Sequence, residues 1–191
     1  MSINVFDHAY YYALKSHARS RVVAALNQKI KQEGNRSAWD KLTLCSIDQK
    51  SISYSRLEWP KYYGPDTHEG FQISWERLNF KFQHRPSYFD LANWQHVDGV
   101  DVLQGMALGR PSNGKRYLAI NWVERYFGPQ YFKGGILLPI LACAEEYAKL
   151  LGSERVLIKD AIDPSKYERY GYSGYKPHKE RECLSKEIKY G

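Results

Sequence analysis

Residues 117–159 read YLAINWVERYFGPQYFKGGILLPILACAEEYAKLLGSERVLIK, and this stretch decides the fold. Apolar and polar side chains alternate over residues 117–127, which predicts a β-strand. Over residues 136–151 the apolar side chains recur at helical spacing, and a glycine follows the last of them. Residues 155–160 contain a short apolar run that predicts a buried strand. A strand–helix–strand unit of this kind implies two parallel strands joined by a right-handed crossover.

Two further strands are predicted ahead of this unit, at residues 88–97 and 102–108, and a last strand is expected at 184–188. The Asp-Gly pair at residues 98–99 is a strong signal for a hairpin turn. Short turns join the three strands that precede the helix, so these strands should run antiparallel. We therefore predict an α/β protein of the α+β type, with a mixed, mainly antiparallel central sheet flanked by helices.

The N-terminal part is predicted to add a long helix, a strand and a short helix. Residues 5–31 form the long helix, whose apolar stripe is Phe6, Tyr10, Ala13, Leu14, Ala18, Val22, Leu26 and Ile30. Arg19 lies off this stripe and is expected in solvent. Residues 42–55 suit a strand, and residues 74–83 suit a short helix with Ser74 as its N-cap.

A loop is predicted at residues 59–70, because two prolines and two glycines interrupt any regular pattern there. Its aromatic and polar side chains are Tyr62, Tyr63, Asp66 and His68. Such a loop either lines a substrate cleft or serves as a packed connector, and the residues alone favour neither.

Composition and charge narrow the classes of protein. The chain has 191 residues, 43% of them hydrophobic, which suits one domain with a real core. Its net charge of +7 would attract nucleic acid or a phosphate-rich cofactor. The three cysteines and six histidines are scattered, so neither a disulfide framework nor a metal site is expected. No signal-peptide pattern and no apolar run near ~20 residues is found, which favours a cytoplasmic protein without a membrane partner.

The segment between the strand at 117–127 and the following helix has the composition of an anion site. Residues 128–135 read GPQYFKGG, so a glycine pair leads into the helix. Backbone N–H groups at such a helix start lack partners within the helix and attract a phosphate, and Lys133 adds a positive charge. A pyrophosphate would suit this place. A tight turn that needs glycine for steric reasons alone explains the same residues.

Residues 163–175, DPSKYERYGYSGY, follow the strand predicted at 155–160. In this segment, and in the order of its strands and helices, the chain resembles the GNAT superfamily of N-acetyltransferases. Members carry, after their fifth strand, Asn-Pro-x-Ala, three residues, Tyr, three residues, and Gly-Phe or Gly-Tyr. Counting from Asp163 places Tyr170 at the motif tyrosine. Matching the run Tyr-Glu-Arg-Tyr-Gly-Tyr places Tyr167 there instead, and this second register is slightly favoured because Glu168 and the residue after it also match.

The resemblance covers roughly residues 70–190 and implies a single GNAT-like domain over residues 1–191. Residues 1–35 would be an N-terminal helical extension, and residues 70–190 the acyl-CoA-binding core. The implied co-substrate is acetyl-CoA or another acyl-CoA, with no metal. The implied cofactor contacts are Tyr126, Phe127, Gly128, Phe132, Lys133, Gly134, Gly135, Ile136 and Leu137.

The cofactor loop departs from the family pattern of Gln or Arg, two residues, Gly, one residue, and Gly or Ala. Aligned on the helix start, this chain has Phe132, Gly135 and Leu137, so only the glycine matches. A leucine side chain could crowd the backbone where the pyrophosphate should approach. Backbone donors around Gly134, together with Lys133, could compensate.

In the GNAT superfamily an amine attacks the thioester directly, so a base must deprotonate the amine and an acid must protonate the thiolate. The resemblance points to Tyr167 or Tyr170 as the acid. Glu124, on the strand at 117–127, is the candidate base, although a glutamate beside Arg125 at a strand end can be merely structural. His96 on an earlier strand is another option, although a lone histidine near a turn is ordinarily a surface residue.

The resemblance implies an N-acyltransferase whose acceptor is an amine on a small molecule, a protein or an aminoacyl-tRNA. The basic charge tilts this expectation slightly toward a polyanionic acceptor, and nucleic-acid contact is a related expectation. Family members are often homodimers. The alternative is a catalytically degenerate GNAT-fold protein that binds nucleic acid or a protein partner through its basic surface.

Overall fold

The computed structural model describes residues 5–33, 42–65, 70–129, 135–177 and 181–190. Seven strands form one sheet in the order β1-β2-β3-β4-β5-β7-β6. They are β1 (Leu42–Cys45), β2 (Phe89–Val97), β3 (Val100–Pro111), β4 (Tyr117–Arg125), β5 (Arg155–Ile158), β6 (Ser173–Tyr175) and β7 (Cys183–Glu187). β4 and β5 pair in parallel and every other neighbouring pair is antiparallel. The predicted mixed, mainly antiparallel sheet is confirmed.

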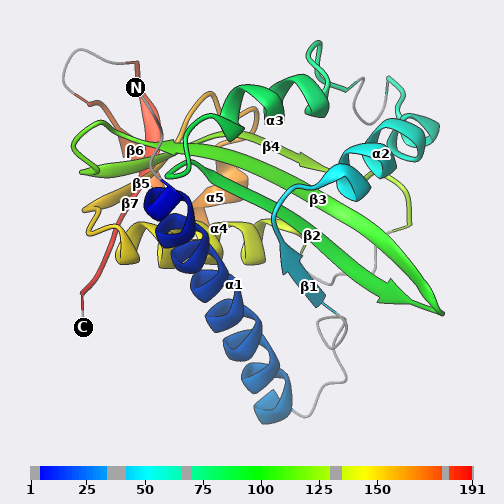
Figure 1. Cartoon of the computed structure of the whole chain (residues 1–191), viewed down its shortest axis with the longest axis horizontal. Coiled ribbons are helices and arrows are strands. Elements are labelled where there is room, and N and C mark those ends of the chain that lie inside the picture. The colour runs from blue at the N-terminus through cyan, green and yellow to red at the C-terminus, as the bar shows by residue number, and fades with distance from the viewer. Residues whose placement is uncertain (1–4, 34–41, 66–69, 130–134, 178–180, 191) are drawn as a thin grey trace.

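Helices cover both faces of this sheet (Figure 1). They are α1 (Val5–Glu33), α2 (Gln49–Leu57), α3 (Trp75–Gln83), α4 (Leu137–Leu150), the short α5 (Ser165–Glu168), and a 3-10 turn, η1 (Trp59–Tyr62). α1 and α4 pack on one face and share a core cluster with the sheet. α2, η1 and α3 close a second cluster on the other face. In the described part of the chain, no helix combines the length and apolarity needed to cross a membrane.

The strand predicted at residues 42–55 is wrong in its second half. β1 ends at Cys45, and residues 49–57 form α2 instead. The cause is a capping box: the Asp48 side chain accepts a hydrogen bond from the Ser51 backbone N–H, and the Ser51 hydroxyl accepts one from the Asp48 N–H. The short strand β6 was also not predicted.

The long N-terminal helix is confirmed as α1, but its packing differs from the prediction. Ala18 and Val22 are buried, whereas Phe6 and Tyr10 nearer the N-terminus are 80% and 55% exposed. Arg19, expected in solvent, is 7% exposed. The reason is an acidic partner on the sheet whose side chain is only 14% exposed.

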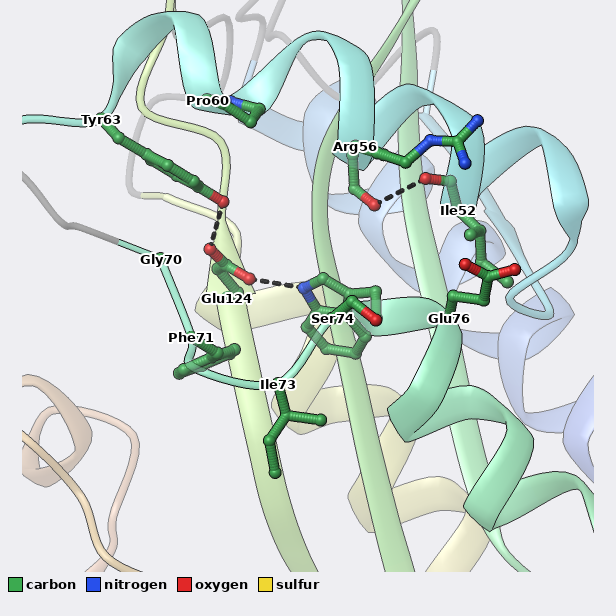
Figure 2. A pocket seen from close by; sticks show the side chains of 12 residues that line it. Ile52, Arg56, Pro60, Tyr63, Gly70, Phe71, Ile73, Ser74, Glu76 and Glu124 are labelled. Carbon is green, nitrogen blue, oxygen red and sulfur yellow. Dashed lines mark hydrogen bonds between the residues drawn. The ribbon is translucent and has the colours of Figure 1, made fainter.

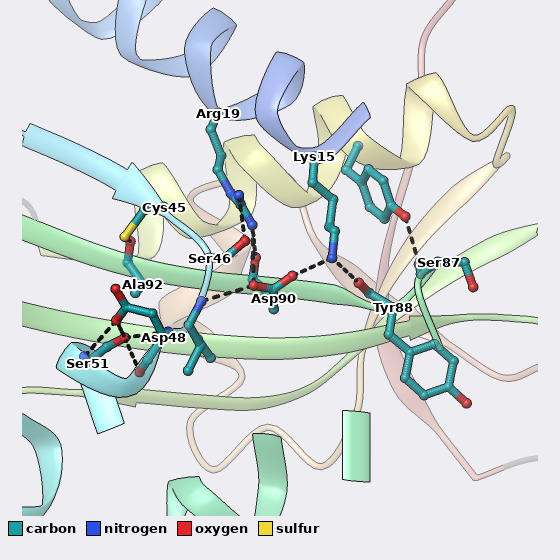
Figure 3. A network of polar contacts seen from close by, with 12 residues as sticks. Lys15, Arg19, Cys45, Ser46, Asp48, Ser51, Ser87, Tyr88, Asp90 and Ala92 are labelled. Carbon is teal, nitrogen blue, oxygen red and sulfur yellow. Dashed lines mark hydrogen bonds and ion pairs between the residues drawn. The ribbon is translucent and has the colours of Figure 1, made fainter. Parts of the chain in front are cut away.

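Asp90 on β2 is that partner, and it joins α1 to the sheet (Figure 3). Its carboxylate forms ion pairs with Lys15 at 2.6 Å and Arg19 at 3.4 Å, and accepts a hydrogen bond from the Ile47 backbone N–H. Arg19 also donates to the Asp90 carbonyl and to the Ser46 hydroxyl. Burial alone would raise the pKa of Asp90, but the two cations and the hydrogen bonds outweigh it and hold the pKa below its ordinary value.

Replacing Asp90 by Asn should lower the free energy of unfolding at pH 7 by about 3 kcal/mol, because the buried Arg19 and the partly buried Lys15 would lose their counter-charge. The folded pKa of Asp90 is depressed, so its contribution is complete above the unfolded pKa of about 4 and is lost as the pH falls through the lower folded value. The difference between the two proteins should therefore shrink in acid. Urea unfolding at pH 7 and below pH 4 measures both effects.

The matched control is Asp101→Asn. Asp101 pairs with Lys50 and His96 on an exposed hairpin, where solvent screens the charges, so little loss of stability is expected. An Asp90→Asn variant no less stable than this control would show that the buried cluster does not hold α1 in place.

Candidate functional site

β4 and β5 pair over four residues and then separate. Their register runs from Tyr117 opposite Arg155 to Ile120 opposite Ile158, and the Lys159 N–H donates a backbone hydrogen bond to the Ile120 carbonyl just beyond it. β4 nevertheless stays paired with β3 as far as Arg125. Within the described residues, the second half of β4 thus has a sheet partner on one side only.

A β-bulge at Asn121 coincides with this separation. Leu108 of β3 lies opposite Trp122, and the next β3 residue, Gly109, lies opposite Ile120, so Asn121 is the extra residue. Only glycine fits at this crossing: a Cβ on Gly109 would lie 2.7 Å from the Ala119 carbonyl oxygen, which is backbone and cannot move aside. Beyond the bulge, Trp122 and Glu124 face the α2–α3 layer.

Glu124 is buried, at 4% exposure, and two aromatic side chains bind its carboxylate. The Tyr63 hydroxyl donates to one oxygen at 2.6 Å, and the Trp75 indole N–H donates to the other at 2.5 Å. Figure 2 shows the Tyr63 ring reaching across from the segment after η1 to the carboxylate on β4. The carboxylate is therefore held in one orientation by donors from a different layer of the fold.

The phenol of Tyr63 remains a donor over a wide pH range. Burial and the hydrogen bond to the Glu124 carboxylate raise the pKa of Tyr63 well above its ordinary value. Trp75 is itself fixed by packing: its ring stacks edge-on against Trp59, which is fully buried and donates its own N–H to the Leu103 carbonyl at 3.1 Å. The support for Glu124 thus extends into the core.

A pocket of about 200 Å³ opens beside this carboxylate. α2 and the segment from η1 to α3 line it, and β4 contributes Glu124. Its lining residues are Ile52, Ser55, Arg56, Pro60, Tyr63, Gly70, Phe71, Ile73, Ser74, Trp75, Glu76 and Glu124. Of the loop at residues 59–70, which the sequence left open between a cleft wall and a connector, Pro60, Tyr63 and Gly70 contribute to the wall. Asp66 and His68 lie outside the described residues.

The start of α4 is described from Gly135 onward, so Phe132, Lys133 and Gly134 lie outside the described residues. Gly135 has φ +79°, a left-handed conformation, and a Cβ there would meet nothing within 4 Å. No side chain caps the helix at Ile136. The Ile136 side chain packs against Gly105 on β3. The Leu137 side chain packs against the core cluster on the α4 face.

The remaining residues predicted to contact the cofactor follow β4. Tyr126 is buried among the α2 side chains, and its backbone N–H donates to the Gln104 carbonyl. Burial and a hydrogen bond to Tyr62 raise its pKa above the ordinary value. Its ring folds back over Gly128, where a Cβ would lie 2.2 Å from the ring. The Tyr126 side chain therefore has a packing role, and only the backbone of this segment is left as a ligand contact.

Three of the four tyrosines at residues 163–175 occupy different environments. Tyr172 is buried at 1% exposure, and its hydroxyl donates to Glu145 of α4 at 3.1 Å. Tyr167 on α5 is partly buried and packs edge-on against Tyr172. Burial, and to a lesser extent the negative charge of Asp163, raises the pKa of Tyr167. Tyr170 is partly buried with the Arg169 guanidinium over its ring.

The predicted catalytic residues are not brought into one cluster. Tyr167 packs against the cluster on the α4 face, whereas Glu124 belongs to the pocket on the α2–α3 face. Both flank the place where β4 and β5 separate, one on β4 and one in the segment that follows β5.

The sequence did not identify Tyr63 and Trp75 as partners of Glu124. Tyr63 lies in the aromatic loop whose role was left open, so composition gave a partial signal. Trp75 gave none, because a tryptophan in the first turn of a helix is ordinarily a packing residue. Only the docking of the α2–α3 layer on the sheet brings the three together.

No protein-family model and no curated protein matches the sequence. Solved structures do: a GNAT-family protein from Desulfovibrio desulfuricans is 15% identical, with a TM-score of 0.52 over 78% of this chain and 99% of that one. The ribosomal-protein-S18-alanine N-acetyltransferase of Escherichia coli is 12% identical, with a TM-score of 0.51 over 78% of this chain and 96% of that one. The protein yncA of Salmonella typhimurium, solved with its cofactor acetyl-CoA, is also 12% identical, with a TM-score of 0.51 over 80% and 96%.

These similarities establish a fold. The chain has the fold of the GNAT acetyltransferases, as its sequence indicated. In the described part of this chain the fold has seven strands in the order β1-β2-β3-β4-β5-β7-β6, and β4 pairs with β5 over four residues only. The helix α1 lies at its N-terminus.

Replacing Gly109 by Ala should lower the free energy of unfolding by about 1–3 kcal/mol, because the new Cβ would collide with the Ala119 carbonyl and distort the bulge. The control is Gly114→Ala in the turn between β3 and β4, since a Cβ on Gly114 would meet only the Arg116 side chain at 4.0 Å. Chemical denaturation of both variants makes the comparison. Equal stabilities would show that the crossing at the bulge is not tight.

Proposed function

We propose that the chain is an acyl-CoA-dependent N-acyltransferase, which moves an acetyl or related acyl group from a CoA thioester to an amine. The observation that carries the proposal is the buried carboxylate of Glu124, oriented by two donors on the half of β4 that extends beyond its pairing with β5. The GNAT fold adds support, since structural neighbours with this fold include an N-acetyltransferase and a protein solved with acetyl-CoA.

The described residues fit a CoA thioester in two places. The backbone of β4 beyond Asn121, where β5 has left, suits the extended pantetheine arm, which would add to the strand edge. The start of α4 suits the pyrophosphate, because the helix has no side-chain cap at Ile136 and Gly135 leaves open space. Leu137, whose side chain could have crowded this place, packs against the core instead.

The transfer needs a base on the acceptor side and an acid on the thiol side. Glu124 takes a proton from the acceptor ammonium, and the free amine attacks the thioester carbonyl carbon. The new C–N bond forms and the C–S bond breaks as the tetrahedral intermediate collapses. The sulfur leaves as a thiolate and receives a proton from a tyrosine hydroxyl. The phenolate is restored by the second proton that the nitrogen loses as it becomes an amide, so that the products are the amide, the free thiol and the proton held by Glu124. Tyr63 and Trp75 act through Glu124 by fixing its orientation.

Tyr167 is our candidate for the acid. In the register that selects it, the closing Gly-Tyr pair is Gly171 and Tyr172. Gly171 has φ +84°, which favours glycine, and the Tyr172 side chain is buried. The raised pKa of Tyr167 keeps its hydroxyl protonated at neutral pH, as a proton donor must be. In the other register Gly174 closes the motif, but φ at Gly174 is not positive.

Wild-type protein should bind acetyl-CoA in isothermal titration and acetylate an amine, and Glu124→Gln should lower kcat by about 10²–10⁴-fold because the base is lost. Glu154→Gln is the control, an exposed glutamate that pairs with Arg116. Retention of full activity by Glu124→Gln would refute the role of the base. Wild-type protein that binds no CoA but elutes from heparin with a steep salt dependence would instead indicate the nucleic-acid-binding alternative.

Tyr167→Phe should lower kcat by a similar factor while the KM for acetyl-CoA stays nearly constant, since only the proton donor is removed. Tyr170→Phe, the same change on the neighbouring turn, should keep its kcat. Steady-state kinetics with both variants decides between the two registers. The reverse result would assign the acid to Tyr170, and two fully active variants would exclude both residues.

A further inference from the structure

We infer that Glu145 on α4 is a positioning residue for the proposed acid. Together with Lys186 of β7 it fixes the side chain of Tyr172, and through Tyr172 it holds Tyr167 in place. We call Glu145, Lys186 and Tyr172 the Tyr172 clamp. Its role in catalysis rests on the proposed acyl transfer, whereas the clamp itself consists of contacts that can be tested without any chemistry.

The helix that carries Tyr167 is too short to hold this side chain by itself. α5 comprises the four residues Ser165–Glu168, none of which is fully buried, and no side chain caps its start. A single helical turn has little stability of its own in water. The position of Tyr167 therefore depends on what its ring and its backbone contact.

Tyr172 makes both kinds of contact with Tyr167. The two rings meet edge-on with 6.4 Å between their centroids, and the Tyr172 backbone N–H donates to the Tyr167 carbonyl at 3.4 Å. Tyr172 is 1% exposed and belongs to the core cluster on the α4 face. A group that fixes the Tyr172 side chain therefore also fixes the surface on which Tyr167 packs.

Glu145 holds the polar end of Tyr172. One Glu145 oxygen accepts hydrogen bonds from the Tyr172 hydroxyl at 3.1 Å and from the Lys186 ammonium at 2.9 Å, and the other oxygen accepts from Lys186 at 2.8 Å. The Lys186 nitrogen also lies 5.8 Å from the centroid of the Tyr172 ring. Burial and the Glu145 carboxylate raise the pKa of Tyr172 well above its ordinary value, so its hydroxyl stays a donor.

The same helix carries the proposed phosphate site and the anchor of the proposed acid. Glu145 lies about two and a half turns along α4 from Ile136 at the helix start. The helix therefore fixes the spacing between the place proposed for the pyrophosphate and the residue that holds Tyr172. Because Glu145 is remote from the helix start, we expect it to affect the chemical step and not the binding of CoA.

Glu146, the next residue of α4, provides a matched control. Its side chain is 26% exposed, against 24% for Glu145. Each carboxylate forms an ion pair with a basic side chain, Glu146 with Arg21 and Glu145 with Lys186. Arg21 lies on α1, so loss of its ion pair should leave Tyr172 unaffected.

Hydrogen exchange, followed by NMR on the full chain, tests the clamp. The backbone N–H groups of Tyr170, Gly171 and Tyr172 all donate to carbonyls of α5. Glu145→Ala should speed their exchange at least about 10-fold, because the segment loses its support, whereas Glu146→Ala should leave it unchanged. Tyr172→Phe removes only the hydroxyl, so it preserves the packing and should have the same effect to a smaller extent. Exchange as slow as in the wild type in both Glu145→Ala and Tyr172→Phe, or in Tyr172→Phe alone if Glu145→Ala does not fold, would overturn the inference.

Steady-state kinetics test the role of the clamp in catalysis. Glu145→Ala should lower kcat by about 10–10²-fold and leave the KM for acetyl-CoA nearly constant, because a displaced acid slows the chemical step alone. Glu145→Gln keeps an oxygen that accepts from the Tyr172 hydroxyl, so it should recover most of this loss. In the Tyr167→Phe chain, Glu145→Ala should cause no further loss, because the acid that it positions is already absent. An equal loss of kcat in both backgrounds would indicate a merely structural role and overturn the inference.

Failure of this inference differs from failure of the proposed function. An active wild-type chain whose kcat is unaffected by Glu145→Ala would support acyl transfer and refute the positioning role. A wild-type chain that neither binds acetyl-CoA nor acetylates an amine would refute acyl transfer, and the positioning role would fall with it. The exchange measurement would then still decide whether Glu145 holds the segment that carries Tyr167.

Discussion

The structure depends on one strand that has to satisfy two neighbours of unequal length. β4 pairs with β3 along its whole length but with β5 over only four residues. The extra residue at Asn121 shifts the register of β4 against β3. The half of β4 that pairs with β5 and the half that carries Glu124 therefore follow different registers. Gly109 makes this shift feasible, because the β3 backbone approaches β4 too closely for any side chain. The candidate site is the consequence of this local break in an otherwise regular sheet.

The second constraint is the attachment of α1 to the sheet. Taking one charged side chain fully and two partly out of water costs solvation free energy, and the cost is offset here because each cation reaches Asp90 and further acceptors. Lys15 also donates to the Tyr88 carbonyl at 3.2 Å. The cluster thus spans α1, β2 and the turn after β1, three segments far apart in sequence. Part of the basic charge of the chain serves this internal purpose and never reaches a ligand.

The sequence predicted most of the fold because its main elements carry local signals. The helical period of α4, the Asp-Gly turn after β2 and the short strand β5 are each readable within a dozen residues, and Asp98 and Gly99 both have the positive φ that the turn requires. α2 was missed because its capping box stands in a stretch rich in serine and threonine that also suits a strand. β6 is three residues long and exists only because β7 offers it an edge.

The site was less predictable, for a physical reason. Glu124 was found through its strand, but its burial depends on a layer that is formed by other segments. The exposure of Arg19 was predicted wrongly for the same reason, since periodicity shows which face of a helix is polar and not whether a polar residue meets a partner. Residues 132–134, named for the cofactor loop, lie outside the described part of the chain and remain a prediction.

The two donors that hold Glu124 come from 61 and 49 residues earlier in the chain. The carboxylate is therefore oriented only while the layer of α2, η1 and α3 is docked on the sheet. If that layer opened locally, the sheet and the α1–α4 face could stay folded while the carboxylate lost its orientation and its pocket. The working lifetime of the site is thus set by the local stability of one layer, and hydrogen exchange in α3 would report it more faithfully than the melting temperature of the whole chain.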